Sequence, residues 1–136
     1  LSREPERIAP ALEEIVPWTT PSVSKRRTLT RDTELAGQPL RAGDKLTFWE
    51  MSANRDEAVF EHPFRFDIAR DPNPHLGFGH GVHYCLGAIL SRLESRVMLE
   101  ELLAAGYRIE ITGDAVWTRD NRLFGLKHLP VSITVR

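Results

Sequence analysis

The chain has 136 residues and carries 18 Lys and Arg against 19 Asp and Glu, which gives a formal net charge of -1. This balance excludes the strong positive field of a protein that binds nucleic acid or an anionic membrane. A hydrophobic fraction of 41% is typical of one globular domain with a real core. No apolar run approaches membrane-spanning length, so we expect no membrane span.

The compartment is predicted from cysteine usage and from the start of the chain. One cysteine and no disulfide framework are typical of the reducing cytoplasm. No signal peptide opens the chain, which starts at Leu1 inside a charged stretch. We therefore expect a cytoplasmic protein, recorded as a piece of a longer polypeptide.

The first predicted element is a short helix over residues 10–16, with a turn before it from Arg3. Its apolar residues recur at helical spacing: Ile8, Leu12, Ile15 and Val16. Pro17 is expected to end this helix, because proline lacks the backbone N–H that a helix interior requires.

Residues 18–50 read as strands separated by turns. The turn signals are at 36–37 and 42–44, and the clearest strand is predicted over 46–49. Residues 52–56 are expected to cap a helical turn. Prolines then exclude regular structure over 62–80, which predicts a long loop, and ordered loops of that length tend to be functional.

The strongest helix is predicted over residues 86–105. One apolar stripe runs along it: Leu86, Ile89, Leu90, Leu93 and Val97. We expect this stripe to be buried. Strand alternation follows at 107–111 and again at 131–135, with a turn at 112–114. Helices and antiparallel strands in this order predict an α+β fold.

The only cysteine, Cys85, lies in the segment F-G-H-G-V-H-Y-C-L-G over residues 78–87. It can form no internal disulfide, which leaves redox-inert packing, nucleophilic attack or metal ligation. The three glycines let the backbone approach a flat or bulky group. A helix that begins at the sulfur aims free N–H groups at it and favours thiolate, the form that binds metal. The segment therefore favours ligation.

A zinc site is one alternative for this segment. His80, His83 and Cys85 are residue types that bind zinc, but H-x2-H-x-C is not a common zinc spacing. His75 could be the fourth ligand only if its loop folded back. A zinc-stabilised interaction module is thus a distant alternative. A covalent c-type haem is excluded because C-x-x-C-H is absent.

The same segment resembles the haem-binding loop of the cytochrome P450 family, whose pattern is F-x-x-G-x-H-x-C-x-G. The defined positions are matched by Phe78, Gly81, His83, Cys85 and Gly87. The resemblance continues in chain order, with 10–16 similar to the K helix, 18–50 to the small β-sheet, 62–80 to the meander, 86–105 to the L helix and 107–136 to the C-terminal β-hairpins. It implies that residues 1–136 are the C-terminal part of one such domain, with the N-terminal two thirds absent.

The resemblance implies haem b (iron protoporphyrin IX) as cofactor, with Cys85 as the proximal thiolate ligand and the only metal ligand. The N–H groups of residues 86–88 are expected to donate hydrogen bonds to its sulfur. The other implied cofactor-binding residues are Phe78, which shields the sulfur, His83 and Arg27, which hold the haem propionates, and Gly87.

Two pairs of residues are expected to contact substrate. Val23 and Lys25 lie in a stretch similar to the strand that lines the family's active site, and Leu123 and Phe124 resemble the tip of a hairpin that reaches over substrate. Packing in the core is the alternative for each pair. Segments 52–56 and 127–131 resemble actinobacterial members that act on steroid side chains or branched lipids.

The family's K helix carries E-x-x-R, a glutamate and an arginine that lock to an arginine of the meander. Here Glu14 is present and Arg65 matches the meander arginine, but the partner position is Pro17. Proline cannot replace a planar fork that binds carboxylate through paired donors. We therefore expect a structural lock of Glu14 and Arg65 alone, with weaker folding or impaired haem retention.

The family's acid–threonine motif for oxygen activation is absent, so no catalytic residue is expected in this chain. The leading prediction is a haem-thiolate monooxygenase, or its haem-ligating C-terminal part, that hydroxylates a lipophilic small molecule such as a steroid or branched lipid. It would use O2 and electrons from NAD(P)H through a ferredoxin-type partner, docked on the proximal face near Arg92 and Arg96. The alternative is a non-catalytic truncated relic or fragment.

Overall fold

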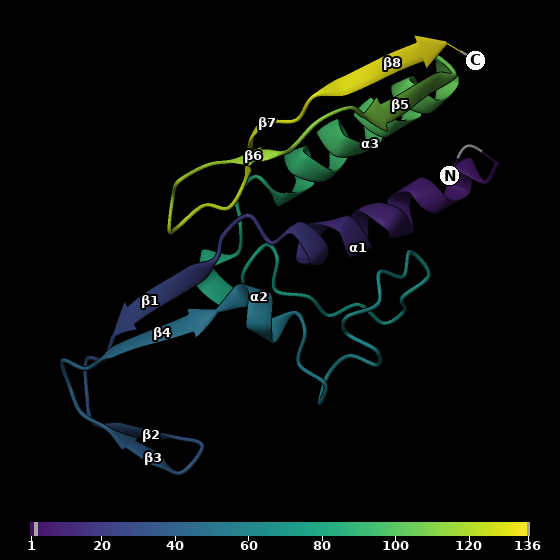
Figure 1. Ribbon diagram of the computed structural model, residues 1–136. Coiled ribbons are helices and arrows are strands. Elements are labelled where there is room, and N and C mark those ends of the chain that lie inside the picture. Colours follow the sequence, from purple (N-terminus) through teal and green to yellow (C-terminus); the bar gives the residue numbers. More distant parts are fainter. Residues whose placement is uncertain (2, 136) are drawn as a thin grey trace.

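The computed structural model describes residues 1 and 3–135 and has an α+β fold, as predicted (Figure 1). The helical elements are η1 (Pro5–Arg7), α1 (Ile8–Thr19), α2 (Glu50–Ala53), η2 (Gly81–His83) and α3 (Ala88–Ala104). The strands are β1 (Ser24–Thr28), β2 (Thr33–Leu35), β3 (Gln38–Leu40), β4 (Lys45–Trp49), β5 (Tyr107–Ile111), β6 (Val116–Trp117), β7 (Leu126–His128) and β8 (Val131–Val135). Residues 62–80 contain no helix or strand, in agreement with the predicted loop.

The strands form four antiparallel pairs, each of two strands: β1–β4, β2–β3, β5–β8 and β6–β7. The predicted strands at 46–49, 107–111 and 131–135 are confirmed. The turn at Ala36 and Gly37 has positive φ at both residues, 49° and 79°, which is the two-residue loop that matches the twist of a hairpin. In Figure 1 the β1–β4 and β2–β3 hairpins extend away from the end of α1.

Helix α1 is the centre of the core. It packs beside α3, which in turn contacts β5 (Figure 1). The buried apolar residues are few and gather around it: Ile8, Ala11, Leu12, Phe60 and Ala88. Buried polar groups lie among them, including Glu14, and those groups must find partners inside the protein.

The apolar stripe of α3 is exposed, and the prediction that it is buried is wrong for this chain. Ile89 is 82% exposed and Leu93 49%. The helix turns its opposite side toward α1, where Ala88 is buried, so the stripe faces away from the rest of the described residues. Periodicity correctly predicts an apolar face, but it does not specify which segment covers that face.

Helix α1 continues through Pro17 to Thr19, so the prediction that Pro17 ends it is wrong. Proline cannot donate to the carbonyl four residues earlier, which here belongs to Glu13. Asn73 supplies the missing donor, because its Nδ2 lies 3.1 Å from the Glu13 carbonyl oxygen. The helix therefore keeps its geometry with a side-chain donor from the loop.

Asn73→Ala is expected to lower the free energy of unfolding by about 2 kcal/mol, because it removes donors from a backbone carbonyl and from the Glu14 carboxylate. In a Pro17→Ala background the cost should fall by about 1 kcal/mol, since residue 17 regains an N–H for the Glu13 carbonyl. Urea unfolding of the four proteins of this cycle measures the difference, with exposed Asn121→Ala as control. Equal costs of Asn73→Ala in both backgrounds would contradict the compensation.

Candidate functional site

Cys85 lies on an exposed loop between η2 and α3. Its N–H donates to the carbonyl of Phe78 at 2.8 Å, which closes the loop, and its carbonyl accepts from the N–H of Ala88 at 3.2 Å. The helix begins at Ala88, later than the predicted 86, so the thiol precedes the helix by three residues. The side chain is thus presented at the N-terminal end of α3.

The N–H groups of residues 86–88, predicted to donate to the Cys85 sulfur, differ in their hydrogen bonds. Within the described part of the chain, the N–H groups of Leu86 and Gly87 have no hydrogen-bond acceptor. A Cβ built on Gly87 would lie 3.9 Å from Cys85 Sγ, so this residue passes against the sulfur. The N–H of Ala88, the third group predicted to bond the sulfur, donates to the Cys85 carbonyl instead. Among the described residues, the predicted hydrogen bonds from residues 86–88 to the Cys85 sulfur are therefore not formed, and the N–H groups of Leu86 and Gly87 are left without an acceptor.

The surface around the thiol is open and apolar. Val82, three residues before Cys85, and Leu86, directly after it, are fully exposed. Gly79 and Gly81 adopt positive φ of 76° and 66°, conformations that fold the loop back and that larger residues rarely adopt. One sulfur donor on such a surface fits a flat apolar group with a metal at its centre, which is the description of haem.

The two predicted propionate anchors are both exposed cations or potential cations. Arg27 lies on β1, where its Nη1 donates to the Arg26 carbonyl at 3.0 Å and its Cζ lies 6.0 Å from the Phe48 ring centroid. His83 ends η2 and is exposed. Neither side chain is committed to a carboxylate of this chain among the described residues. Both are available for an anionic group.

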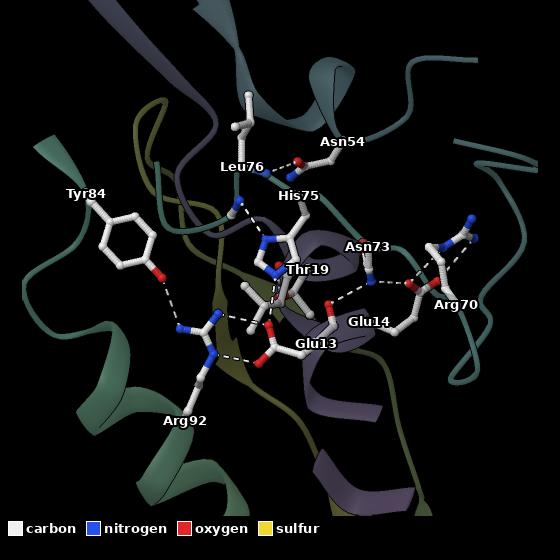
Figure 2. Close-up of polar contacts among 12 residues, drawn as sticks. Glu13, Glu14, Thr19, Asn54, Arg70, Asn73, His75, Leu76, Tyr84 and Arg92 are labelled. Atoms are coloured by element: carbon white, nitrogen blue, oxygen red, sulfur yellow. Dashed lines mark hydrogen bonds and ion pairs between the residues drawn. The ribbon is translucent and has the colours of Figure 1, made fainter. Parts of the chain in front are cut away.

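Two consecutive glutamates of α1, Glu13 and Glu14, bind side chains of the 62–80 loop (Figure 2). Glu13 binds Arg92 of α3 through two hydrogen bonds, 2.6 Å to Nε and 2.9 Å to Nη2, and contacts His75 Nε2 at 3.2 Å. The hydrogen bond from Arg92, with a further one from His75, holds the pKa of Glu13 below its usual value. The same carboxylate raises the pKa of Arg92. The ion pair is therefore fully charged at neutral pH.

Glu14 is bound by Arg70, not by Arg65, which corrects the predicted structural lock. Its carboxylate accepts from Arg70 Nε at 3.0 Å and from Asn73 Nδ2 at 3.1 Å (Figure 2). It also accepts from the N–H of Asp67 at 2.9 Å. Arg65 contributes only its carbonyl, which accepts from Arg70 Nη2 at 2.8 Å. The carboxylate thus has several donors although Pro17 offers none.

The four predicted substrate contacts lie in two segments that meet. The N–H of Val23 donates to the carbonyl of Arg122 at 3.1 Å, and the N–H of Phe124 donates to the carbonyl of Pro21 at 2.7 Å. Leu123 forms a bridge with Ser22 between them. The Phe124 ring stacks on Trp117 with centroids 4.4 Å apart. Backbone hydrogen bonds therefore hold Val23, Leu123 and Phe124 in two adjacent segments, in which the consecutive residues Leu123 and Phe124 point to opposite sides.

The conformation of the loop that carries Leu123 is fixed by Asp120. Its carboxylate accepts from the N–H groups of Arg122 and Leu123, which hold its pKa below the usual value.

Lys25 is committed to a buried carboxylate. Its Nζ lies 2.9 and 3.0 Å from the two oxygens of Glu50 and 2.6 Å from Ser22 Oγ. Glu50 is 1% exposed, so this ion pair neutralises a charge inside the protein. Glu50 carried no signal in the sequence, because a lone glutamate after a strand looks like a surface residue.

The cations expected to attract a partner are also paired. Arg92 binds Glu13, and Arg96 lies 3.5 Å from Glu100 one turn along α3.

For the zinc alternative, the described residues contain no group of three His, Cys, Asp or Glu placed to hold a metal ion. None of the described helices is both long enough and apolar enough to cross a membrane.

Comparison with known proteins agrees with this geometry. The family model described as Cytochrome P450 matches residues 12–135. The chain is 56% identical over 128 residues to the putative cytochrome P450 126 of Mycobacterium tuberculosis, covering 94% of this chain and 31% of that protein. It is 47% identical over 144 residues to a methyl-branched lipid omega-hydroxylase of the same species, covering 97% and 34%.

A solved structure supports the same relationship. Cytochrome P450-153 from Novosphingobium aromaticivorans superposes with a TM-score of 0.93 at 40% identity, over 98% of this chain and 34% of that chain. The chain therefore spans about a third of the length of the relatives it matches.

Proposed function

The chain belongs to the cytochrome P450 family, and from that premise we propose that it is the haem-ligating part of a monooxygenase, with Cys85 as the thiolate ligand of iron. The observation that carries this proposal is the exposed Cys85 thiol, set before a helix and followed by two N–H groups that have no acceptor in the described part of the chain. We also propose that residues 1–136 form the C-terminal part of one domain whose larger part is outside this chain.

Each residue around the thiol has a proposed task. The N–H groups of Leu86 and Gly87 donate to the sulfur and stabilise its negative charge, which tunes the iron that it binds. Phe78 shields the sulfur from water. Arg27 and His83 bind the propionates, Arg27 through a planar fork suited to carboxylate.

The chemistry supplied by bound haem is activation of O2, in which one oxygen atom enters a C–H bond of the substrate and the other leaves as water after two electrons and two protons are taken up. Side chains that deliver those protons are not proposed for this chain, which lacks the acid–threonine motif. The electrons are proposed to come from NAD(P)H through a ferredoxin-type partner on the proximal face. Arg92 and Arg96 are each paired with a glutamate. We therefore propose that the partner binds mainly to the exposed face around Cys85, and that these two charges contribute less to its binding.

The proposed substrate is a lipophilic small molecule. Three apolar residues in two adjacent segments, Val23, Leu123 and Phe124, support this class, since the side chains of Leu123 and Phe124 are exposed. A relative named for methyl-branched lipid hydroxylation favours a branched lipid over a steroid. Lys25 is proposed to contact substrate only through its stem, because its ammonium group binds Glu50. The cytoplasmic location stays a prediction from the single cysteine.

The exposed stripe of α3 is proposed to be covered by the part of the domain outside this chain. The stripe and the exposed apolar residues of β5 and β8 leave more hydrophobic surface than a monomer normally shows. The relatives are about three times longer than the chain, which supplies the polypeptide needed to cover it.

Haem reconstitution tests the proposed function. After reduction and addition of carbon monoxide, the haem-loaded chain is expected to show the strongly red-shifted Soret band of a thiolate complex. Cys85→Ala should bind haem without that shift, whereas His83→Ala should keep the shift and bind haem more weakly. The same unshifted band in the wild-type chain and in Cys85→Ala would overturn the proposal.

A further inference from the structure

Arg92 of α3 is shared by three segments of the chain. Its Nε and Nη2 bind the carboxylate of Glu13 on α1. Its Nη1 donates to the hydroxyl of Tyr84 at 3.1 Å, and its Cζ lies 4.4 Å from the centroid of the Phe78 ring. One guanidinium therefore forms an ion pair, a hydrogen bond and a cation–π contact at once (Figure 2 shows the first two).

Both loop contacts of Arg92 adjoin Cys85. Tyr84 precedes it in the chain, and the carbonyl of Phe78 accepts the Cys85 N–H. The two arms of the loop that presents the thiol thus meet at the same cation. If Arg92 moved, the side chain on each arm would lose a contact to α3.

The cation is itself held in place. Glu13 lies on α1, the most buried helix, and its second partner is His75, whose side chain is 5% exposed. The N–H of Gly77 donates to His75 Nδ1 at 3.1 Å, which leaves Nε2 to carry the proton donated to Glu13. Hydrogen bonds therefore run from Gly77 through His75 to the Glu13 carboxylate, and Arg92 donates to the same carboxylate from α3.

We propose that Arg92 is a positioning residue for the Cys85 loop, held by Glu13 so that it fixes Phe78 and Tyr84 on either side of the thiol. The effect of Arg92 on the iron rests on the proposed haem ligation. The effect of Arg92 on the position of the loop does not depend on haem. A lysine at this position would keep the positive charge but would not replace the planar guanidinium. An ammonium group cannot bind both oxygens of the carboxylate, the tyrosine hydroxyl and the phenylalanine ring in one fixed plane.

Amide hydrogen exchange of the cofactor-free chain tests the positioning directly. Cys85 N–H is protected by its bond to Phe78, and Tyr84 N–H by its bond to the Gly81 carbonyl at 2.9 Å. Arg92→Gln is expected to speed exchange of both amides about tenfold through local opening, and Arg92→Lys nearly as much. Amides of the β5–β8 pair should be unchanged, which separates loop opening from global unfolding.

The matched control is Arg96→Gln, one turn further along α3, where the arginine pairs with Glu100 and with no other carboxylate of the described residues. It should leave the Cys85 and Tyr84 amides within about twofold of the wild type. Unchanged exchange in Arg92→Gln, or equal effects of the Arg92 and Arg96 substitutions, would overturn the proposal.

The haem-loaded chain gives a second readout. With carbon monoxide, reduced Arg92→Gln should show a larger fraction of unshifted Soret band than the wild type, and its reduction potential should move, while Arg96→Gln matches the wild type. If the wild-type chain shows no thiolate-type band at all, the proposed function fails, and the exchange result still decides the role of Arg92. If the band is normal in Arg92→Gln and exchange is also unchanged, only the positioning proposal fails.

Discussion

Glu14→Ala is expected to lower the free energy of unfolding by about 4 kcal/mol, the largest effect of any single substitution considered for this chain. The carboxylate is 3% exposed and faces Arg70, whose side chain is 11% exposed. Without it, a nearly buried guanidinium loses its counter-charge and the N–H of Asp67 loses its acceptor. Urea unfolding followed by tryptophan fluorescence measures the loss.

The control for Glu14→Ala is Glu61→Ala, which removes a carboxylate that is 89% exposed and whose one ion-pair partner among residues 1 and 3–135 is exposed His62. Its cost should stay within about 0.5 kcal/mol. Arg70 keeps its bonds to the carbonyls of Glu61 and Arg65 in both variants, so the comparison isolates the buried charge. A loss in Glu14→Ala no larger than in Glu61→Ala would show that the carboxylate is not the centre of the lock.

Lys25→Met is expected to cost about 3 kcal/mol, because it leaves the 1% exposed carboxylate of Glu50 without a cation. The methionine keeps most of the apolar stem, so packing changes little. The ammonium is partly exposed, which places this effect below that of Glu14→Ala.

The double variant Lys25→Met with Glu50→Met should recover most of that loss, since removing both charges also removes the cost of burying them. The same urea unfolding series measures the cycle. If the double variant is as unstable as the two single costs added together, the pair is not coupled and the account of Glu50 is wrong.

The Cys85 segment was predictable because its constraints are local. Positive φ at Gly79 and Gly81 and the approach of Gly87 to the sulfur are properties of neighbouring residues. A pattern of ten residues was therefore enough to predict both the loop and the protein family, and the family membership is confirmed. The hairpin turn at 36–37 was predictable for the same reason.

Helix α1 shows where local reasoning fails. Pro17 predicts a helix end from its own chemistry, but Asn73, 56 residues further along the chain, supplies the donor that keeps the helix intact. No feature near Pro17 indicates that donor. The prediction that Arg65 is the partner of Glu14 failed in the same way, because Arg65 and Arg70 both lie in an irregular loop whose path is set by contacts far away in sequence.

The ion pairs were the least predictable part of the site. Glu13, Glu50 and Arg92 are ordinary charged residues in the sequence, and a charge on a helix is usually solvated. A possible signal was the pair of glutamates at 13 and 14, since two neighbouring side chains of a helix cannot both face the same side. One therefore points toward α3 and the other toward the loop, as Figure 2 shows.

The central claim is that Cys85 binds the iron of haem, and X-ray absorption at the iron edge of the haem-loaded chain tests it most directly. The account predicts one sulfur neighbour at bonding distance beside the four ring nitrogens, present in the wild type and in Arg96→Gln and lost in Cys85→Ala. An iron with only nitrogen and oxygen neighbours in the wild-type chain would contradict it.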